Sequence, residues 1–87
     1  MKTYFISYKG NAAYLKTIFG DAPRTRTTQE FFESEDGSWP IFITSTYITL
    51  NEQQELALRD WLFLSTSNAL NQVSVCRLVQ DDTHRVH

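Results

Sequence analysis

Few residues of the types that perform chemistry stand close together in this sequence. The one thiol, Cys76, lies in an apolar run, and the two histidines, His84 and His87, fall in the last four residues. A nucleophilic thiol needs a base beside it, and neither histidine is near Cys76 in sequence. The histidine spacing suits metal ligands on a helix, but no cysteine or further histidine accompanies the pair. We therefore expect a chain that is not an enzyme and that holds no metal and no cofactor.

Length and composition indicate one small folded domain. The chain has 87 residues, of which 41% are hydrophobic and 21% are charged, which is ordinary for a folded chain. We expect the domain to span residues 1–80 and residues 81–87 to form a frayed tail. With one cysteine, no leader pattern and no apolar run of about 20 residues, the expected location is the cytoplasm, with no membrane partner.

The stretch 41–70 organises the predicted fold, because an apolar strand leads directly into the longest helix. Asn51 is expected to cap that helix, with Gln54 placed to reach back to it as a capping box. A shorter helix is expected to begin after Asn11 and to stop at Gly20. In the final strand, Val73, Val75 and Val79 are expected to alternate with Ser74, Cys76 and Leu78. The predicted strands are 3–8, 40–50 and 73–80, and the predicted helices are 12–19 and 52–66.

The sequence of residues 24–34 is compatible with either a strand or a short helix. Their threonines and phenylalanines favour a strand, whereas Thr27 or Thr28 could cap a short helix. The strand is favoured because the following Glu35-Asp36-Gly37-Ser38 resembles a hairpin turn. The element order then predicts an α+β fold: a two-layer split βαβ (ferredoxin-like) sandwich, βαββαβ, with an antiparallel sheet and both helices on one face. If this segment is helical, three strands and three helices remain.

The outer side of the long helix is the first candidate site. At 100° per residue, Trp61 belongs to the broad apolar face, and Leu56 and Phe63 lie opposite it. If Trp61 packs on the sheet, the other two side chains face solvent, unless the tail or a loop covers them. Acidic residues near them in sequence would form a polar rim; the candidate rim residues are Glu52, Glu55, Asp60, Glu33 and Glu35.

The charges of the chain are segregated along the sequence. Residues 1–26 hold five lysines or arginines and one aspartate, whereas residues 27–60 hold seven acidic residues and one arginine. Folding either intermingles these charges or leaves one acidic flank that steers the protein toward a basic partner.

The uncovered face of the sheet is the second candidate site. Phe5, Phe42 and Phe31 (or Phe32) could act there as platforms on which nucleic-acid bases stack. This topology resembles that of RNA-recognition modules, but residues 40–47 lack the basic-glycine-aromatic motif of that family. The net charge of −2 also disfavours binding to phosphates.

The favoured functional hypothesis is a small protein-binding module that blocks a surface of another protein. Small inhibitors encoded by phages and mobile elements, including anti-CRISPR proteins, are one such class, although no motif in this chain points to them. The alternatives are a single-stranded nucleic-acid-binding domain and a structural homodimer.

Overall fold

Six elements follow one another in the computed structural model, which describes residues 1–33, 35, 37, 40–66 and 71–81. They are β1 (Lys2–Lys9), α1 (Ala13–Phe19), β2 (Arg24–Glu33), β3 (Pro40–Leu50), α2 (Glu52–Ser65) and β4 (Val73–Asp81). The predicted turn at 35–38 and the predicted tail at 81–87 lie largely outside the described residues. Asp81 itself belongs to β4, so that strand ends one residue later than expected.

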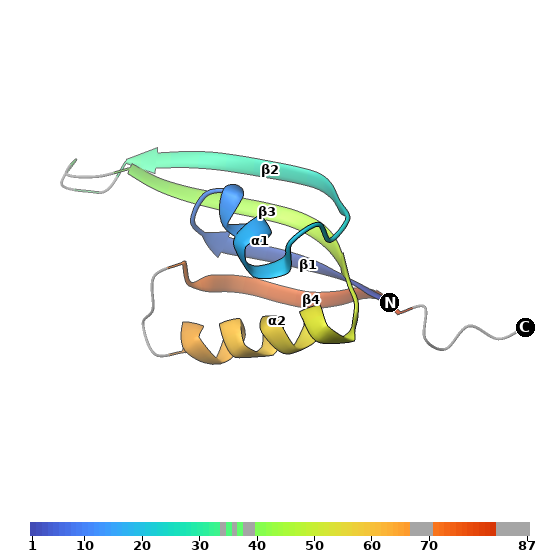
Figure 1. The fold of residues 1–87 in the computed structure, drawn as a ribbon. Coiled ribbons are helices and arrows are strands. Elements are labelled where there is room, and N and C mark those ends of the chain that lie inside the picture. The colour runs from blue at the N-terminus through green and yellow to red at the C-terminus, as the bar shows by residue number, and fades with distance from the viewer. Residues whose placement is uncertain (34, 36, 38–39, 67–70, 82–87) are drawn as a thin grey trace, which may run out of the picture.

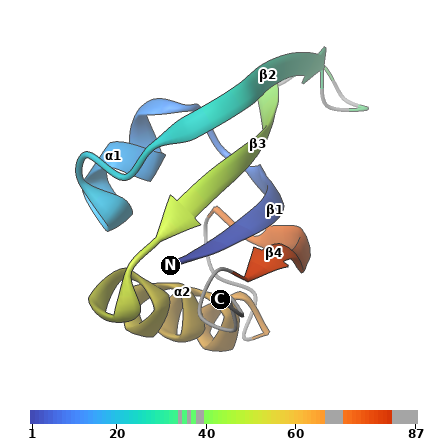
Figure 2. The ribbon, with the colours of Figure 1, turned by 90° about the vertical axis from the view of Figure 1, so that its right-hand side faces the viewer.

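The four strands form one sheet in the order β2-β3-β1-β4, and each neighbouring pair is antiparallel. Both helices lie on the same side of this twisted sheet (Figures 1 and 2). The predicted α+β fold, with a four-stranded antiparallel sheet and two helices, is confirmed. None of the helices in the described part of the chain is long and apolar enough to cross a membrane.

Alternate residues of a strand point to opposite faces of the sheet, and the face that lies beneath the helices contributes to the core. We call this the helix-side face and the other one the open face. On the helix-side face, Tyr4 pairs with Ile48, Ile6 with Thr46, and Tyr8 with Thr44. The buried apolar side chains are Ile6, Tyr8, Leu15, Phe19, Ala22, Ile48, Leu50, Leu58 and Trp61.

The two buried threonines of β3 have hydrogen-bond partners. The Thr44 hydroxyl donates to the Gly10 carbonyl at 2.7 Å, and the hydroxyls of Thr46 and Thr27 lie 2.8 Å apart. These bonds remove most of the cost of burying a hydroxyl, which would be about 1–3 kcal/mol without a partner. The polar residues of β3 therefore fit within the core.

Residues 24–33, which the sequence left open between strand and helix, form a strand, as we favoured. β2 is an edge strand whose ten residues are all exposed. Its pairing with β3 shifts between Thr25 and Thr28, and Arg26 in this bulge has a positive φ of 53°. The bulge leaves the Arg26 side chain beside Tyr47 on the open face.

The N-terminus of α1 differs from the prediction. Ala12, rather than Asn11, occupies the cap position, and no side chain caps this helix. The Asn11 backbone carbonyl instead accepts hydrogen bonds from the Tyr8 hydroxyl and the Tyr14 N–H. The Asn11 carbonyl is thus engaged, but no side chain takes the place of the expected cap.

The N-terminus of α2 agrees with the prediction. The Asn51 side chain accepts a hydrogen bond from the Gln54 backbone N–H at 2.8 Å, and the Gln54 side chain accepts one from the Asn51 N–H at 2.8 Å. The Gln54 amide also donates to the Phe19 carbonyl at 3.0 Å, which ties α2 to the end of α1.

The strict alternation predicted for β4 is wrong. The β1–β4 register shifts twice, between Thr3 and Tyr4 and between Ser7 and Tyr8. Each irregularity inserts an extra residue into β4 and changes which of its side chains share a face. As a result, Val73, Cys76 and Leu78 pair with the helix-side residues of β1.

Candidate functional site

Trp61 fixes the rotation of α2 about its own axis. The indole ring packs against the rings of Tyr8, Tyr14 and Phe19, with centroid distances of 4.9, 5.5 and 6.0 Å. Its Nε1–H donates a hydrogen bond of 2.8 Å to the Asn71 carbonyl, just before β4. Only 5% of Trp61 is exposed, so the apolar ring is buried and its one polar atom has a hydrogen-bond partner inside the fold.

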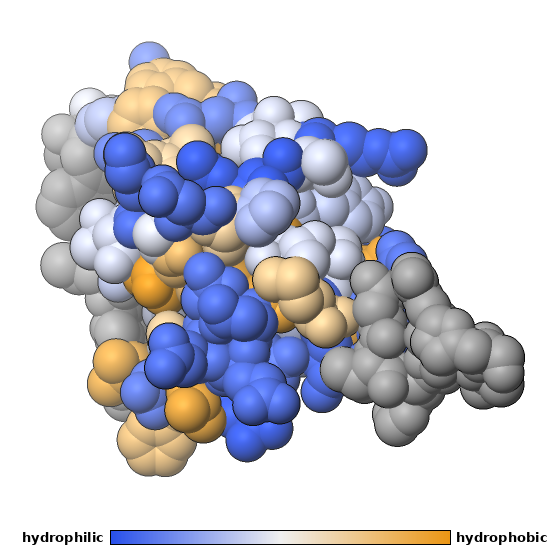
Figure 3. All heavy atoms as spheres, turned by 45° about the vertical axis from the view of Figure 1, so that its right-hand side comes forward, coloured by the Kyte–Doolittle hydropathy of each residue, from blue (hydrophilic) through white to orange (hydrophobic). Residues whose placement is uncertain are grey.

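The opposite side of α2 consequently faces solvent. Phe63 is 76% exposed and Leu56 is 59% exposed, as the helical spacing predicts. Leu64, which follows Phe63, is also 54% exposed. Figure 3 shows apolar side chains gathered on this lower edge of the molecule, over α2. We call Leu56, Asp60, Phe63 and Leu64, with Glu52 and Arg59 at their border, the α2 outer surface.

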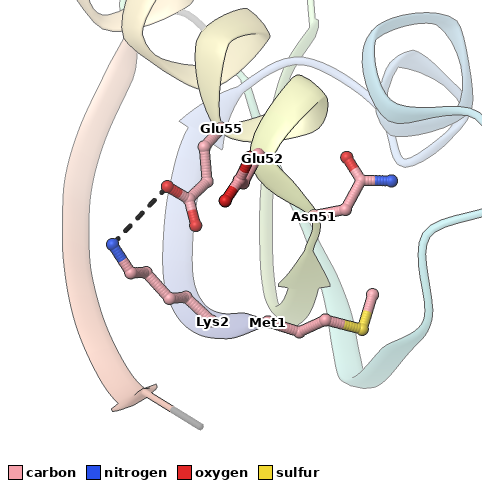
Figure 4. A pocket seen from close by; sticks show the side chains of 5 residues that line it. All are labelled: Met1, Lys2, Asn51, Glu52 and Glu55. Carbon is pink, nitrogen blue, oxygen red and sulfur yellow. Dashed lines mark ion pairs between the residues drawn. The ribbon is translucent and has the colours of Figure 1, made fainter. Parts of the chain in front are cut away.

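Glu55 does not belong to this surface, although it was expected there. Its carboxylate forms an ion pair with the Lys2 ammonium at 3.6 Å, and its side chain is only 14% exposed. The two groups face each other across a hollow that is also lined by Met1, Asn51 and Glu52 (Figure 4). The hollow lies at the N-terminal end of α2, and its lysine and Glu55 carboxylate are engaged with one another.

Glu33 and Glu35 also lie away from the α2 outer surface. Glu33 ends β2, and the strand order places β2 at the edge of the sheet opposite β4. α2 packs against α1, β3 and β4. Figure 1 shows the arrowhead end of β2 well separated from α2. The predicted acidic rim is therefore reduced to Glu52 and Asp60, with the cation Arg59 beside them.

The open face carries a row of four side chains, one from each strand. Phe5 of β1 and Tyr47 of β3 are register partners, and their ring centroids lie 5.0 Å apart. The guanidinium carbon of Arg77, on β4, lies 5.0 Å from the Phe5 ring centroid. That of Arg26, on β2, lies 5.7 Å from the Tyr47 ring centroid. We call Arg77, Phe5, Tyr47 and Arg26 the open-face row.

Two of the three phenylalanines expected on the open face lie on the helix side instead. Phe42 is two residues from the buried Thr44 and so shares its face, and Phe31 is its register partner. Their ring centroids lie 5.3 Å apart on the part of the hairpin that extends past α1 (Figure 1). Phe5 lies on the open face, and so does Phe32, the alternative to Phe31, because Phe32 is the register partner of Ile41.

Sequence reasoning missed the other three members of the open-face row. A signal for Tyr47 was present, because Tyr47 alternates with Ile48 and Leu50, which are the core residues of β3. Arg26 and Arg77 gave no comparable signal, because a strand register and a bulge place them beside the rings.

The thiol of Cys76 is half-buried in β4. Burial raises the pKa of the half-buried Cys76 thiol above its ordinary value, which disfavours the reactive thiolate. Within the described residues, no group of three His, Cys, Asp or Glu side chains could hold a metal ion. His84 and His87, like Asp36, lie outside the described residues.

Comparison with protein families, with characterised proteins and with solved structures finds no match to this chain.

Proposed function

We propose that this chain is a non-catalytic module that binds another protein through the α2 outer surface and thereby occludes part of that protein. The supporting observation is the contrast between two side chains on one helix: Trp61 is 5% exposed, whereas Phe63, two residues later, is 76% exposed. The Trp61 ring contacts and hydrogen bond hold the helix in this rotation. Phe63 therefore cannot turn inward without loss of that anchor.

The exposed apolar side chains supply the driving force in this proposal. Complete burial of a Leu or Phe side chain stabilises by about 1.5–3 kcal/mol relative to exposure in water, and more than half of each remains exposed here. A partner that covers Leu56, Phe63 and Leu64 would gain most of that free energy. Large apolar side chains at the centre of a patch, with polar residues at its rim, are typical of interfaces.

The charges at the rim suggest the chemistry of the partner. Glu52 and Asp60 are exposed beside the apolar side chains, with one cation, Arg59. The complementary partner is an apolar recess bordered mainly by lysine or arginine, because opposite charges favour encounter and like charges oppose it.

We further propose that the fold is of the split βαβ, ferredoxin-like kind. Support comes from the strand order, in which β3 separates β1 from β2 and β1 separates β3 from β4. A helix joins the two strands of each separated pair, so the chain contains two interleaved βαβ units.

The test compares tagged wild-type protein with the variants Phe63→Glu and Leu56→Glu in capture experiments from the native host. Thr17→Glu, at an exposed position of α1, is the charge-matched control. We expect one protein to bind the wild type and the control but neither α2 variant, while circular dichroism shows all four chains folded. Unchanged capture by both α2 variants would contradict the proposal.

Sedimentation of the purified protein distinguishes the homodimer alternative. If wild type and Thr17→Glu dimerise and Phe63→Glu is monomeric, the partner at the α2 outer surface is a second copy of this chain. If Phe63→Glu unfolds the chain, then Phe63 is a core residue and the proposed surface does not exist.

A further inference from the structure

The open-face row combines two aromatic rings with two planar cations across the full width of the sheet. Adjacent strands lie about 4.8 Å apart, so a row over four strands spans about 14 Å. The two rings occupy its centre, and Arg77 and Arg26 occupy its ends. The row is an elongated surface that presents two aromatic rings, inclined to each other by 53°, to the planar groups of a ligand.

The side chains that flank the two rings along the central strands of this face are short. Two residues from them on either side, the hydroxyls of Thr3 and Thr49 lie 2.9 Å apart, and Ser45 donates to Ser7 at 3.0 Å. These short side chains are hydrogen-bonded to one another and lie lower than an aromatic ring. Phe5 and Tyr47 are only partly buried, and a base that stacks on either ring takes the place of the guanidinium that lies over it.

The open face is locally basic, although the chain has a net charge of −2. Register and ring contacts place the cations Arg26, Arg77 and Lys9 on this face and, among the described strand residues, one carboxylate, Glu30. The acidic residues of α2 lie on the helix side of the sheet (Figure 2). The described strand residues of the open face therefore include more cations than carboxylates, and the overall charge does not describe the field above the row.

We propose that the open face binds single-stranded nucleic acid. Phe5 and Tyr47 stack on two successive bases, and Arg26 and Arg77 contact the flanking phosphates. A guanidinium that a base displaces from a ring stays next to that base, and its N–H edges match the oxygens of a phosphate. Bases offer their flat faces only where the strand is unpaired, so a duplex cannot bind in this way.

This site is separate from the α2 outer surface, because the helices and the open face lie on opposite sides of the sheet (Figure 2). One molecule could hold a strand and a protein at the same time. The two proposals can therefore fail independently.

The test measures fluorescence anisotropy of labelled homopolymers of about 12 nucleotides, a length within the usual site sizes. DNA and RNA strands and a matched duplex are the probes. We expect single strands to bind at low salt and the duplex not to bind through the row. The logarithm of the affinity should fall with the logarithm of salt concentration with a slope of about −1.4, for two phosphates neutralised.

Variants of the row separate stacking from charge. Phe5→Leu and Tyr47→Leu should each weaken binding at least about fivefold and leave the salt slope unchanged, since they remove stacking alone. Arg26→Gln and Arg77→Gln should each weaken binding and reduce the steepness of the slope by about 0.7. Whichever of DNA and RNA binds more tightly identifies the source of the ligand.

Two control variants lie on the helix side. Lys16→Gln removes the same charge from an exposed position of α1, and Phe63→Glu changes the α2 outer surface. Both should bind single strands like the wild type. The proposal is overturned if no single strand binds at low salt, if the duplex binds equally well, or if Lys16→Gln weakens binding as much as Arg77→Gln does.

Discussion

Replacement of Trp61 by alanine tests the rotation of α2 on which the protein-binding proposal depends. Removal of a buried Trp or Phe side chain costs about 3–5 kcal/mol, because apolar burial is lost and a cavity remains. Trp61 is 5% exposed and contacts the rings of Tyr8, Tyr14 and Phe19, so the upper part of that range applies. The variant also leaves the Asn71 carbonyl without its donor.

This loss is a large share of the total stability. A chain of 87 residues has a free energy of unfolding of about 4–13 kcal/mol at typical values per residue. Trp61→Ala is therefore expected to lower the urea midpoint of unfolding severely, or to leave the chain unfolded in water. Phe63→Ala changes a side chain that is 76% exposed and should alter the free energy of unfolding by no more than about 0.5 kcal/mol.

The assay is urea unfolding followed by far-ultraviolet circular dichroism, with the slope of free energy against urea compared among the variants. A loss below about 1 kcal/mol in Trp61→Ala, or above about 2 kcal/mol in Phe63→Ala, would refute the rotation. In either case the α2 outer surface would have been assigned to the wrong side of the helix.

Two further predictions concern the cap of α2 and the response to alkaline pH. Asn51→Ala removes one of the two reciprocal hydrogen bonds with Gln54 and should lower the free energy of unfolding by about 1 kcal/mol, whereas Asn51→Asp should retain most of it; urea midpoints check both. Burial raises the pKa of the Tyr8 hydroxyl above its ordinary value of 10.0, so Tyr8 ionises at lower pH in the unfolded chain than in the folded one. The stability that this group contributes is fully present below pH 10 and is lost as the pH rises from 10 through the folded pKa. Tyr8→Phe should make the decline in thermal midpoint above pH 10 shallower, with the remainder arising in part from Tyr4, whose pKa is also raised by burial and by Glu55; a decline identical to that of the wild type would refute this assignment.

Local patterns determined much of this structure. Hydrophobic periodicity and turn signals predicted the other five elements to within one residue at either end, whereas residues 24–34 were left open between strand and helix, with the strand favoured. The capping box of α2 was also readable, since Asn51 and Gln54 meet within one helical turn. The outward position of Phe63 followed from the same helical geometry once Trp61 was assigned to the core.

Tertiary structure decided which distant residues meet. Glu55 forms an ion pair with Lys2, and the strand order places Glu33 far from α2. Alone, the sequence determined five of the six elements and the side of α2 that faces solvent, whereas the open-face row arose only when four strands paired in one register. The physical reason is that periodicity is a property of neighbouring residues, whereas register and bulges depend on how separate segments pack together.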